Sequence, residues 1–323
     1  MRTDDLISTI IPVYNRPILL REAVASVLNQ TYRPIEIIIV DDGSTDDTRQ
    51  AAATIRSISP DEIKVLRVPN GGPGAAREVG RKQARGEFIQ YLDSDDILLP
   101  EKFTQQIAGL HDDPDCGVSY GKTLYQELDG HPSYEPWKRT GERISKMFPS
   151  FLVSRWWGTS TPLYRRRLTD QAGAWLSLKN EEDWEYDCRI ASLGVRLHYT
   201  DSFVSVQRSH GGNRLSEGGS NDPVKLADRA KAHEAILGHA RDAGIPSTSP
   251  EMQHFARELF LLSRQCGSAG LNDESKKLFQ LSREASSLGK RAGLDFHLYE
   301  LAVRAIGRKA AGKIACHIDK IRL

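Results

Sequence analysis

The first 92 residues alternate between short apolar segments and helical patterns, and this alternation restricts the fold more than any other feature. Strand-like segments, rich in β-branched and aromatic residues, occupy residues 6–14, 35–40, 63–68 and 87–92. Helical patterns of roughly 10 to 15 residues separate them, which favours a parallel sheet with right-handed crossovers. The continuous apolar run at residues 35–40 is typical of a strand covered on both faces. We therefore predict an α/β fold.

Several helix boundaries follow from local signals. Asn15-Arg16-Pro17 opens the first helical pattern, and Ser44 with Asp47 three residues later has the spacing of a second helix start. A third helix is expected over residues 75–84, and a fourth is expected to begin at residues 98–100. Farther along, residues 117–120, 197–200 and 203–207 are strand-like and residues 183–193 helical. Residues 223–323 are helical, with breaks at residues 244–246, Gly270 and Gly289.

Composition excludes several classes of protein. The 323 residues suffice for one large α/β domain with an appendage, or for two domains, and 39% hydrophobic with 27% charged residues is typical of a globular chain. A net charge of +1 gives no indication of nucleic-acid binding. The four cysteines lie far apart without a CxxC pair, which predicts neither a disulfide framework nor a zinc site and fits a reducing cytoplasm. The N-terminus lacks the apolar stretch of a signal peptide, and no segment reaches the ~20 apolar residues of a membrane span. We therefore expect a cytoplasmic protein.

Polar clusters follow three of the predicted strands: Tyr14, Asp41 with Asp42, and Asp93 with Asp95. Ligands of parallel sheets bind outside the carboxyl ends of the strands, so these clusters should converge. Clustered carboxylates repel one another, and a fold that gathers them usually supplies a hard divalent cation, which binds phosphate oxygens. The alternative is an acidic loop that caps the next helix.

This arrangement suits a nucleotide. Tyr14 can offer a ring face to a base, and Asp41 or Asp42 can accept a hydrogen bond from a base N–H or a ribose hydroxyl. Asp93 and Asp95 can hold ribose and metal. Mg²⁺ or Mn²⁺ is expected from such oxygen ligands.

Four segments, in order and at matching intervals, resemble the family 2 inverting glycosyltransferases of the GT-A fold. They are residues 11–15 (IPVYN), 40–46 (VDDGSTD), 70–77 (NGGPGAAR) and 86–96 (GEFIQYLDSDD). The resemblance covers roughly residues 6–212. It implies a Rossmann-like, mostly parallel sheet flanked by helices, and a nucleotide-sugar donor, usually UDP-linked. It also implies that Asp95 ligates the metal, that Asp93 contacts ribose or metal through water, and that Pro12 and Ser94 belong to the donor site.

The same resemblance supplies a catalytic base. Family members carry a Glu-Asp pair at a helix start, which here matches Glu182 and Asp183, with Arg189 and Gly194 following. Transfer to a hydroxyl requires a general base opposite the leaving diphosphate, so we predict that Asp183 accepts the acceptor proton in a direct displacement with inversion. Without the resemblance, an acidic helix start favoured by the helix dipole is the simpler interpretation. Glu181 and Glu182 in the same turn would tend to raise the pKa of such a base.

Weaker signals leave alternatives open. Arg77 can contact the base or diphosphate, or lie on a helix surface. His210 falls in residues 207–216, which resemble a loop that closes over the donor; it can ligate metal or diphosphate, or be a plain loop histidine. Trp156 and Trp157 can form an acceptor platform, or divide between core and surface.

The expected organisation is a GT-A catalytic domain over residues 1–215 and an all-helical extension over residues 216–323. In the last helix, from about Leu298, apolar residues are interleaved with basic ones, and the only acidic residues are Glu300 and Asp319. The basic residues are Arg304, Arg308, Lys309, Lys313, Lys320 and Arg322, and the apolar ones are Leu301, Ile306, Ile314, Ile318 and Ile321. Such a helix either presents a solvated basic face or lies on an anionic membrane surface. Peripheral contact with the inner membrane surface is therefore one of two interpretations.

The same residues bear on four competing functions. A dinucleotide-dependent oxidoreductase would require Gly where Arg77 stands, and an ATPase would require a Gly-Lys-Ser/Thr loop, which is absent from the sequence. A sugar nucleotidyltransferase would require a basic Gly-rich loop near the N-terminus. A non-catalytic scaffold of the same fold stays open, although Asp42, Asp93, Asp95 and Asp183 are all present. The predicted activity is sugar transfer to a hydroxyl of a carbohydrate or lipid-linked acceptor, as in cell-envelope polysaccharide or glycolipid synthesis, with the donor sugar and acceptor undefined.

Overall fold

The computed structural model describes residues 3–127, 130–209, 222–287 and 293–322. The chain divides into two compact units. The first, here called the sheet unit, comprises Met1–Met147, Arg155–Leu178 and Leu193–Gly212. The second, the helical unit, comprises Phe148–Ser154, Lys179–Ser192 and Asn213–Leu323. Each is described by itself.

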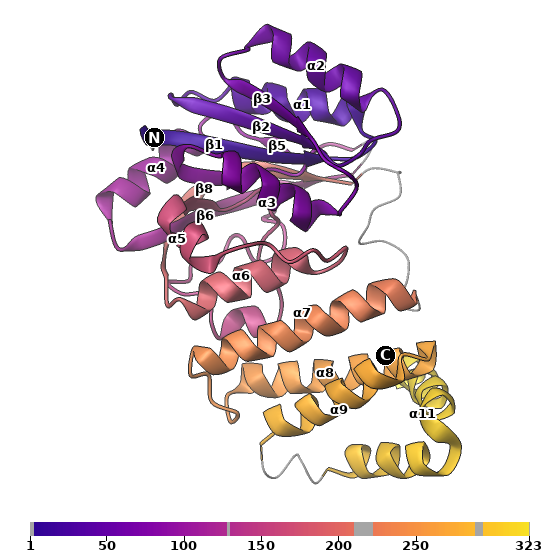
Figure 1. Cartoon of the computed structure of the whole chain (residues 1–323). Helices are drawn as coiled ribbons and strands as arrows, with labels where there is room; N and C mark the ends of the chain where they lie inside the picture. Colours follow the sequence, from indigo (N-terminus) through magenta and orange to yellow (C-terminus); the bar gives the residue numbers. More distant parts are fainter. Residues whose placement is uncertain (1–2, 128–129, 210–221, 288–292, 323) are drawn as a thin grey trace. The chain divides into compact units, whose positions relative to one another are not determined.

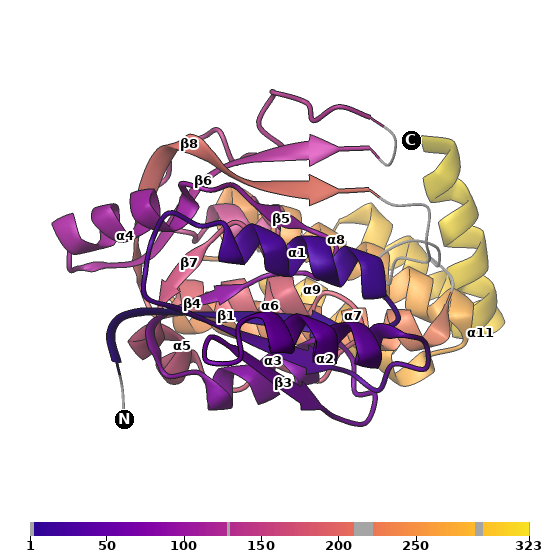
Figure 2. The same ribbon diagram turned by 90° about the horizontal axis from the view of Figure 1, so that it is seen from above.

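The sheet unit is built on one eight-stranded sheet with the strand order β3-β2-β1-β4-β7-β6-β8-β5. Its strands are β1 (Thr3–Val13), β2 (Ile35–Asp41), β3 (Ile63–Arg67), β4 (Gly86–Tyr91), β5 (Ile97–Leu98), β6 (Cys116–Gln126), β7 (Leu163–Arg165) and β8 (Arg196–Arg208). The first four pair in parallel, whereas β7 is antiparallel to both β4 and β6. Strands β6 and β8 again run in parallel, side by side in Figure 2. The predicted α/β fold with a mostly parallel sheet is confirmed.

Helices cover both faces of this sheet. They are α1 (Pro17–Leu28), α2 (Thr48–Ile58), α3 (Pro73–Gln83), α4 (Lys102–Asp112) and α5 (Arg166–Ala172). Side chains of α1, α2 and α4 form one apolar core with the strands, in which Val24, Ile37 and Phe103 are completely buried. Figure 1 shows α3 on the opposite side of the strands from α1 and α2. Gly80 allows α3 to approach closely, because a Cβ there would lie 2.4 Å from Ile10.

Two predicted helix starts are wrong. Residues 97–98 form the short strand β5, which pairs with β8 through Leu98 and Ser205, and α4 begins only at Lys102. Ser44 lies in a loop before α2, where its N–H donates to Asp41 Oδ1 at 2.8 Å. At residues 97–98, pairing with the distant strand β8 outweighs the helix signal. At Ser44, the hydrogen bond to the nearby Asp41 carboxylate outweighs it.

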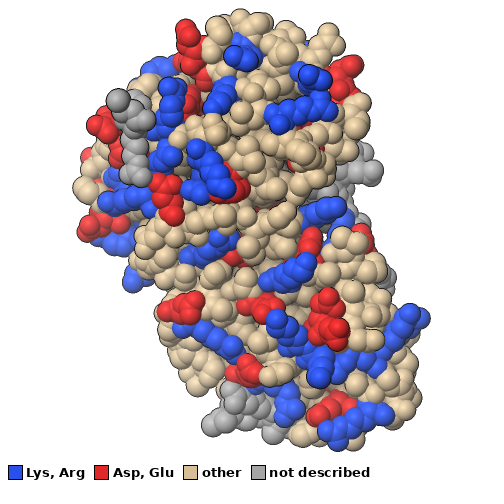
Figure 3. Space-filling model, viewed as in Figure 1, with Lys and Arg blue, Asp and Glu red and all other residues tan. Residues whose placement is uncertain are grey.

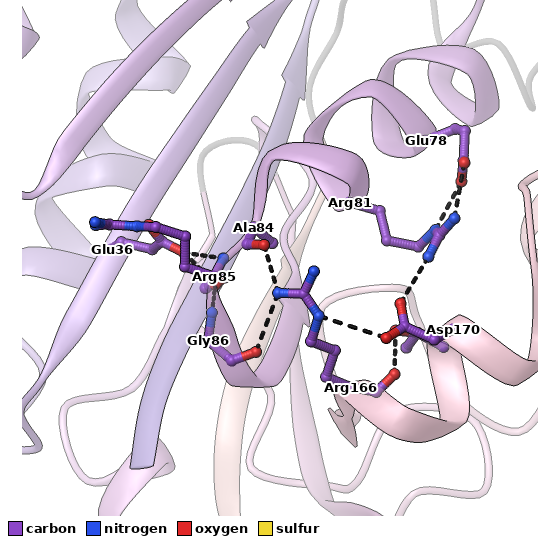
Figure 4. Close-up of polar contacts among 10 residues, drawn as sticks. Glu36, Glu78, Arg81, Ala84, Arg85, Gly86, Arg166 and Asp170 are labelled. Atoms are coloured by element: carbon purple, nitrogen blue, oxygen red, sulfur yellow. Dashed lines mark hydrogen bonds and ion pairs between the residues drawn. The ribbon is translucent and has the colours of Figure 1, made fainter. Parts of the chain in front are cut away.

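Ion pairs hold the end of the sheet at which β2 and β4 begin, and Figure 4 shows them. Glu36, buried within β2, accepts from the Arg85 backbone N–H at 2.6 Å and from Arg85 Nε at 2.9 Å. Arg166 donates to the carbonyl oxygen of Ala84, and Arg81 lies 3.0 Å from Asp170. These contacts fasten α3 and β4 to α5, and they explain how a glutamate is accommodated in an otherwise apolar strand.

The helical unit contains the short 3₁₀ helix η1 (Ser150–Leu152), α6 (Glu182–Ser192), α7 (Pro223–Asp242), α8 (Pro250–Ala269), α9 (Asn272–Ala285) and α11 (Leu294–Arg322). Predicted breaks near Gly244 and Gly270 are confirmed, and both glycines have positive φ. The third predicted break, at Gly289, lies outside the described residues. Helix α11 is kinked at Gly307, where φ is 79°. Aromatic rings fill part of the core, with Phe260 and Phe296 centroids 4.4 Å apart. Of the helices in the described ranges, each is too short or too polar to cross a bilayer.

Candidate active site

The carboxyl ends of β1, β2 and β4 meet at one edge of the sheet. Asp42 donates its N–H to the carbonyl oxygen of Val13 at 2.9 Å. Asn15 Oδ1 accepts a hydrogen bond from the Thr45 N–H (2.8 Å), and the Asn15 backbone N–H donates one to Ser44 Oγ (3.0 Å). The predicted convergence of the three polar clusters is therefore what the structure shows, because parallel strands end at a common edge.

Asp42 shapes the glycine-rich turn that precedes α3. Its two carboxylate oxygens accept hydrogen bonds from Gly71 N–H at 2.8 Å and Gly72 N–H at 2.9 Å. Gly72 has φ of 87°, which a residue with a side chain rarely adopts. Asp41 is 1% exposed and accepts from a loop N–H, so both carboxylates organise the loops around the edge. Their contact with a base or ribose stays a prediction.

Tyr14 follows β1 and is 45% exposed, as a ring that stacks on a base would have to be. Pro12 is buried in β1 and pairs in register with Val40. Ser94 is only 3% exposed. These three positions therefore differ in access, and Tyr14 is the one whose side chain reaches solvent.

Arg77 lies at the site and not on a helix surface. It is 4% exposed, and its Nη2 donates to Asp93 Oδ1 at 2.8 Å. The guanidinium carbon stands 4.8 Å from the centroid of the Trp175 ring, within cation–π range. The interpretation of Arg77 as a solvated surface arginine is wrong, and Asp93 has a cationic partner in this structure.

Asp95 and Asp96 are adjacent but face different partners. Asp95 Oδ2 lies 2.8 Å from Arg16 Nη1, whereas Asp96 is completely buried and accepts from Ser160 Oγ at 2.7 Å and Arg208 N–H at 3.2 Å. Burial, with Asp95 and Asp93 nearby, raises the pKa of Asp96 well above its usual range. Asp96 therefore fastens the turn, and the side chains of Asp93 and Asp95 remain as the metal candidates.

The donor chemistry at this turn fits a hard divalent cation. Asp93 and Asp95 offer carboxylate oxygens, and each already lies against a guanidinium, Arg77 or Arg16, so the turn attracts positive charge. Over the described residues, no cluster of three or more His, Cys, Asp and Glu side chains has the geometry of a complete protein cage. Mg²⁺ and Mn²⁺ commonly take only one or two carboxylates and complete their shell with phosphate oxygens and water. His210, the third candidate ligand, lies outside the described residues.

Trp156 and Trp157 do not form an exposed platform. They are 2% and 0% exposed. Trp157 packs against Tyr120 with ring centroids 5.0 Å apart, and Arg139 stands over the Trp156 ring at 3.9 Å. The prediction of an acceptor surface here is wrong, as is the alternative that divides the pair between core and surface, because both rings complete the core next to β6.

Asp183 lies in the first turn of α6, in the helical unit, and is half-buried. Its Oδ1 accepts from Trp184 N–H at 2.7 Å. Glu181, just before the helix, lies against Arg229 and His233, which lower its pKa against the opposing effect of burial. Glu181 is thus paired with the Arg229 guanidinium. The sequence suggests that its charge would crowd Asp183, but in the structure that charge is compensated.

Sequence reasoning missed three residues at the sheet edge: Arg16, Ser160 and Arg208. Ser160 Oγ contacts both Asp96 and the backbone N–H of Asp93, at 2.7 and 3.2 Å. Arg208, at the end of β8, donates to the carbonyl oxygen of Asp95 and pairs with Glu22. Arg16 had a weak signal, since it directly follows the first polar cluster. The other two approach from strands or turns far along the chain, which no local pattern indicates.

An α/β sheet with aspartates and a glycine-rich turn at one edge defines a nucleotide-binding class of fold. The model of the family "Glycosyl transferase family 2" matches residues 8–168. An uncharacterized glycosyltransferase of Nostoc sp. is 40% identical over 286 residues, which is 86% of this chain and 84% of that protein. The chain belongs to glycosyl transferase family 2.

Solved structures share the fold. S. aureus TarS 1-349 in complex with UDP-GlcNAc superposes with a TM-score of 0.68 at 20% identity, covering 99% of this chain and 92% of that one. The mannosyltransferase PcManGT from Pyrobaculum calidifontis, in complex with GDP-Man and Mn²⁺, gives 0.53 at 17% identity, covering 98% and 86%. The predicted GT-A fold with C-terminal helices is confirmed. Other relatives are longer, and the chain spans 24% of the length of two Rickettsia glycosyltransferases.

Proposed function

We propose that this protein transfers a sugar from a nucleotide diphosphate sugar, UDP-linked, to a hydroxyl of a carbohydrate or lipid-linked acceptor, with inversion at the anomeric carbon. One observation carries the proposal: in a family 2 chain, the edge formed by β1, β2 and β4 presents Asp93 and Asp95 beside two arginines and the exposed ring of Tyr14. The TarS complex with UDP-GlcNAc supports the choice of a UDP-linked donor.

The donor would lie along this edge. Tyr14 stacks on the base, and Asp41 and Asp42 keep the two loops in the shape that receives base and ribose. Asp93 and Asp95 would hold Mg²⁺ or Mn²⁺, which neutralises charge on the departing diphosphate. The Mn²⁺ complex of the mannosyltransferase supports a divalent ion. Arg77 and Arg16, already at the carboxylates, are placed to bind phosphate oxygens once the ion takes the carboxylates.

The acceptor hydroxyl requires a base. We assign this role to Asp183 through its match to the Glu-Asp pair of the family. Its carboxylate removes the hydroxyl proton as the new C–O bond forms, while the bond to the diphosphate breaks from the opposite face. A single displacement of this kind needs no covalent sugar intermediate and inverts the anomeric carbon.

A panel of UDP-, GDP- and dTDP-sugars tests the proposal. We expect thermal stabilisation by one nucleotide class that increases with Mn²⁺, followed by slow donor hydrolysis in the absence of acceptor. Stabilisation without turnover of any donor would identify a binding scaffold of the same fold. Release of diphosphate upon addition of sugar phosphate and nucleoside triphosphate would instead identify a nucleotidyltransferase.

A membrane-facing role for α11 is part of the proposal. Along this helix Leu298, Leu301, Ile314 and Ile318 are 43–63% exposed, and a hollow of about 420 Å³ at the Gly307 kink is lined in part by Lys309 and Lys313. Figure 3 shows basic side chains gathered over the C-terminal helices on the face it presents, with acidic ones among them. Apolar side chains alternating with lysines fit an anionic lipid surface, and a cytoplasmic enzyme would meet one at the inner membrane face.

Vesicle sedimentation tests this contact. Vesicles of phosphatidylglycerol should retain the protein, whereas phosphatidylcholine vesicles should not. The double variant K309Q/K313Q should release it, because each basic side chain near an anionic surface contributes about 1 kcal/mol. Equal retention by both lipids would remove the electrostatic part of the proposal. The boundary of the catalytic domain at residue 215 also stays a proposal; α6 groups with the helices that follow it.

A further inference from the structure

Glu181 has an unusual backbone conformation directly before the helix that carries Asp183. Its φ is +60°, in the left-handed region that glutamate rarely adopts. Its carbonyl oxygen nevertheless accepts the Glu185 N–H at 3.0 Å, the first bond of α6. Such a conformation is unfavourable and persists only where surrounding contacts enforce it.

Those contacts come from α7, which lies beside α6 (Figure 1). Arg229 Nε lies 2.8 Å from Glu181 Oε1, and His233 Nδ1 lies 3.0 Å from Glu181 Oε2. The same His233 nitrogen is 3.0 Å from the carbonyl oxygen of Arg229. Both neighbours of Nδ1 are acceptors, so Nδ1 carries a hydrogen, which it donates to the Arg229 carbonyl oxygen while lying against the carboxylate. The side chain of Glu181 is therefore held at Oε1 by a hydrogen bond from Arg229 and confined at Oε2 by the His233 ring.

The residue after Asp183 is fixed by the same histidine. The Trp184 ring meets the His233 ring edge to face, with centroids 5.4 Å apart, and Trp184 Nε1 donates to the carbonyl oxygen of Phe151 at 2.7 Å. His233 is 1% exposed and stacks on Phe255 of α8 at 5.3 Å. Asp183 thus lies between two residues that α7 immobilises, while its own side chain keeps partial access to solvent.

We propose that Arg229 and His233 are positioning residues: by clamping Glu181 and Trp184 they fix the first turn of α6, and thereby the direction of the Asp183 carboxylate. The C-terminal helices are then part of the catalytic apparatus and not an independent appendage. This inference rests on the proposed role of Asp183, which the experiment below tests separately.

Two substitutions of Glu181 separate positioning from stability. Glu181→Ala removes the clamp and keeps the unfavourable φ, so it should lower both the melting temperature and kcat. Glu181→Gly also removes the clamp but adopts this φ readily, so it should recover much of the melting temperature without recovering kcat. We expect kcat to fall at least about tenfold in both, since small misplacements of a reacting group cost that much or more. The KM for donor should stay unchanged.

Arg229→Gln should reproduce the loss in kcat, and Arg229→Lys should restore part of it. Arg241→Gln is the matched control, because Arg241 also lies on α7 but pairs with Glu284 at an exposed site. Suppose that Asp183→Asn inactivates the enzyme, but Glu181→Gly and Arg229→Gln both keep the wild-type kcat. That result would overturn the positioning proposal and leave the assignment of the base intact. Full transfer by Asp183→Asn would instead overturn the assignment of the base on which it rests.

Discussion

Carboxylates gather in both units, but the two units treat them in opposite ways. At the sheet edge, Asp96 is completely buried and accepts hydrogen bonds from the Ser160 hydroxyl and the Arg208 backbone N–H, and burial raises its pKa. In the helical unit, Glu181 and Glu185 are held by arginine and histidine, which lower their pKa values despite burial. Asp93 and Asp95, at the same edge as Asp96, pair with Arg77 and Arg16. The sheet edge thus gathers three carboxylates against two arginines, whereas Glu181 and Glu185 each have basic partners of their own. The first arrangement suits the proposed ion site, and the second suits a rigid support.

The largest expected effect is at the sheet edge. Asp95→Asn should reduce Mn²⁺-dependent transfer on the order of a thousandfold, because a metal contributes several kcal/mol of charge stabilisation. Transfer and Mn²⁺ binding are measured together. Asp115→Asn is the control, since the Asp115 side chain is 81% exposed. Undiminished Mn²⁺ binding by the Asp95 variant would contradict the metal assignment.

Asp183→Asn, in the helical unit, should impair catalysis and leave donor binding by the sheet unit intact. We expect a loss of kcat on the order of 10²- to 10⁴-fold, the usual contribution of a general base, with the donor dissociation constant unchanged. Isothermal calorimetry with the donor nucleotide and a single-turnover assay measure the two quantities. Asp273→Asn, at the first turn of α9, controls for removal of an acidic helix start. A parallel loss of donor affinity would show that Asp183 acts on the donor instead.

Glu185→Gln tests the support in the helical unit. Glu185 is 1% exposed and lies 2.9 Å from both Arg189 Nε and His239 Nε2, so the substitution should destabilise by about 3 kcal/mol at pH 7. The pKa of Glu185 is lowered from 4.5; burial opposes this, and the bonds from His239 and Arg189 prevail. Its contribution is therefore complete above pH ~4.5 and is lost as the pH falls through the lowered folded-state value.

The difference in melting temperature between wild type and Glu185→Gln should accordingly shrink below pH ~4.5. Glu284→Gln, which removes an exposed pair with Arg241, should show little effect at any pH. A difference that stays constant from pH 7 to pH 3 would mean that the ionised form of Glu185 contributes nothing.

The smallest expected effect concerns Arg16. Its guanidinium lies 2.8 Å from Asp95 Oδ2, so a divalent ion at the proposed site would have to replace it at that oxygen. Arg16→Gln should tighten Mn²⁺ binding about fivefold, corresponding to the roughly 1 kcal/mol of a partly exposed pair. Electron paramagnetic resonance of free Mn²⁺ measures this without turnover. Arg196→Gln, which alters exposed pairs with Asp113 and Asp115, serves as the control. Weaker Mn²⁺ binding by Arg16→Gln would show that the arginine organises the site.

Local patterns predicted most of the sheet unit. Strands β1 to β4 follow from short apolar, β-branched segments separated by helical patterns. Only residues 35–40 have the continuous apolar run of a strand covered on both faces, and β2 is buried along its whole length. The carboxyl ends of the four strands then had to share one edge, which placed Asp42 and Asp95 together. The same reasoning misjudged Leu98, since pairing with Ser205 of β8 depends on a strand more than 100 residues away. It also misjudged Trp157, whose burial depends on Tyr120 and not on its neighbours in the chain.

The sequence by itself determined the alternation of strands and helices over the first 92 residues, the edge at which polar residues collect, and the family, because these depend on periodicity and on short contiguous motifs. The tertiary structure decided which charges meet: Arg77 with Asp93, Arg16 with Asp95, and Glu181 with Arg229. Ion pairs form between side chains that folding brings within about 3 Å, and their separation along the chain carries no information about that distance.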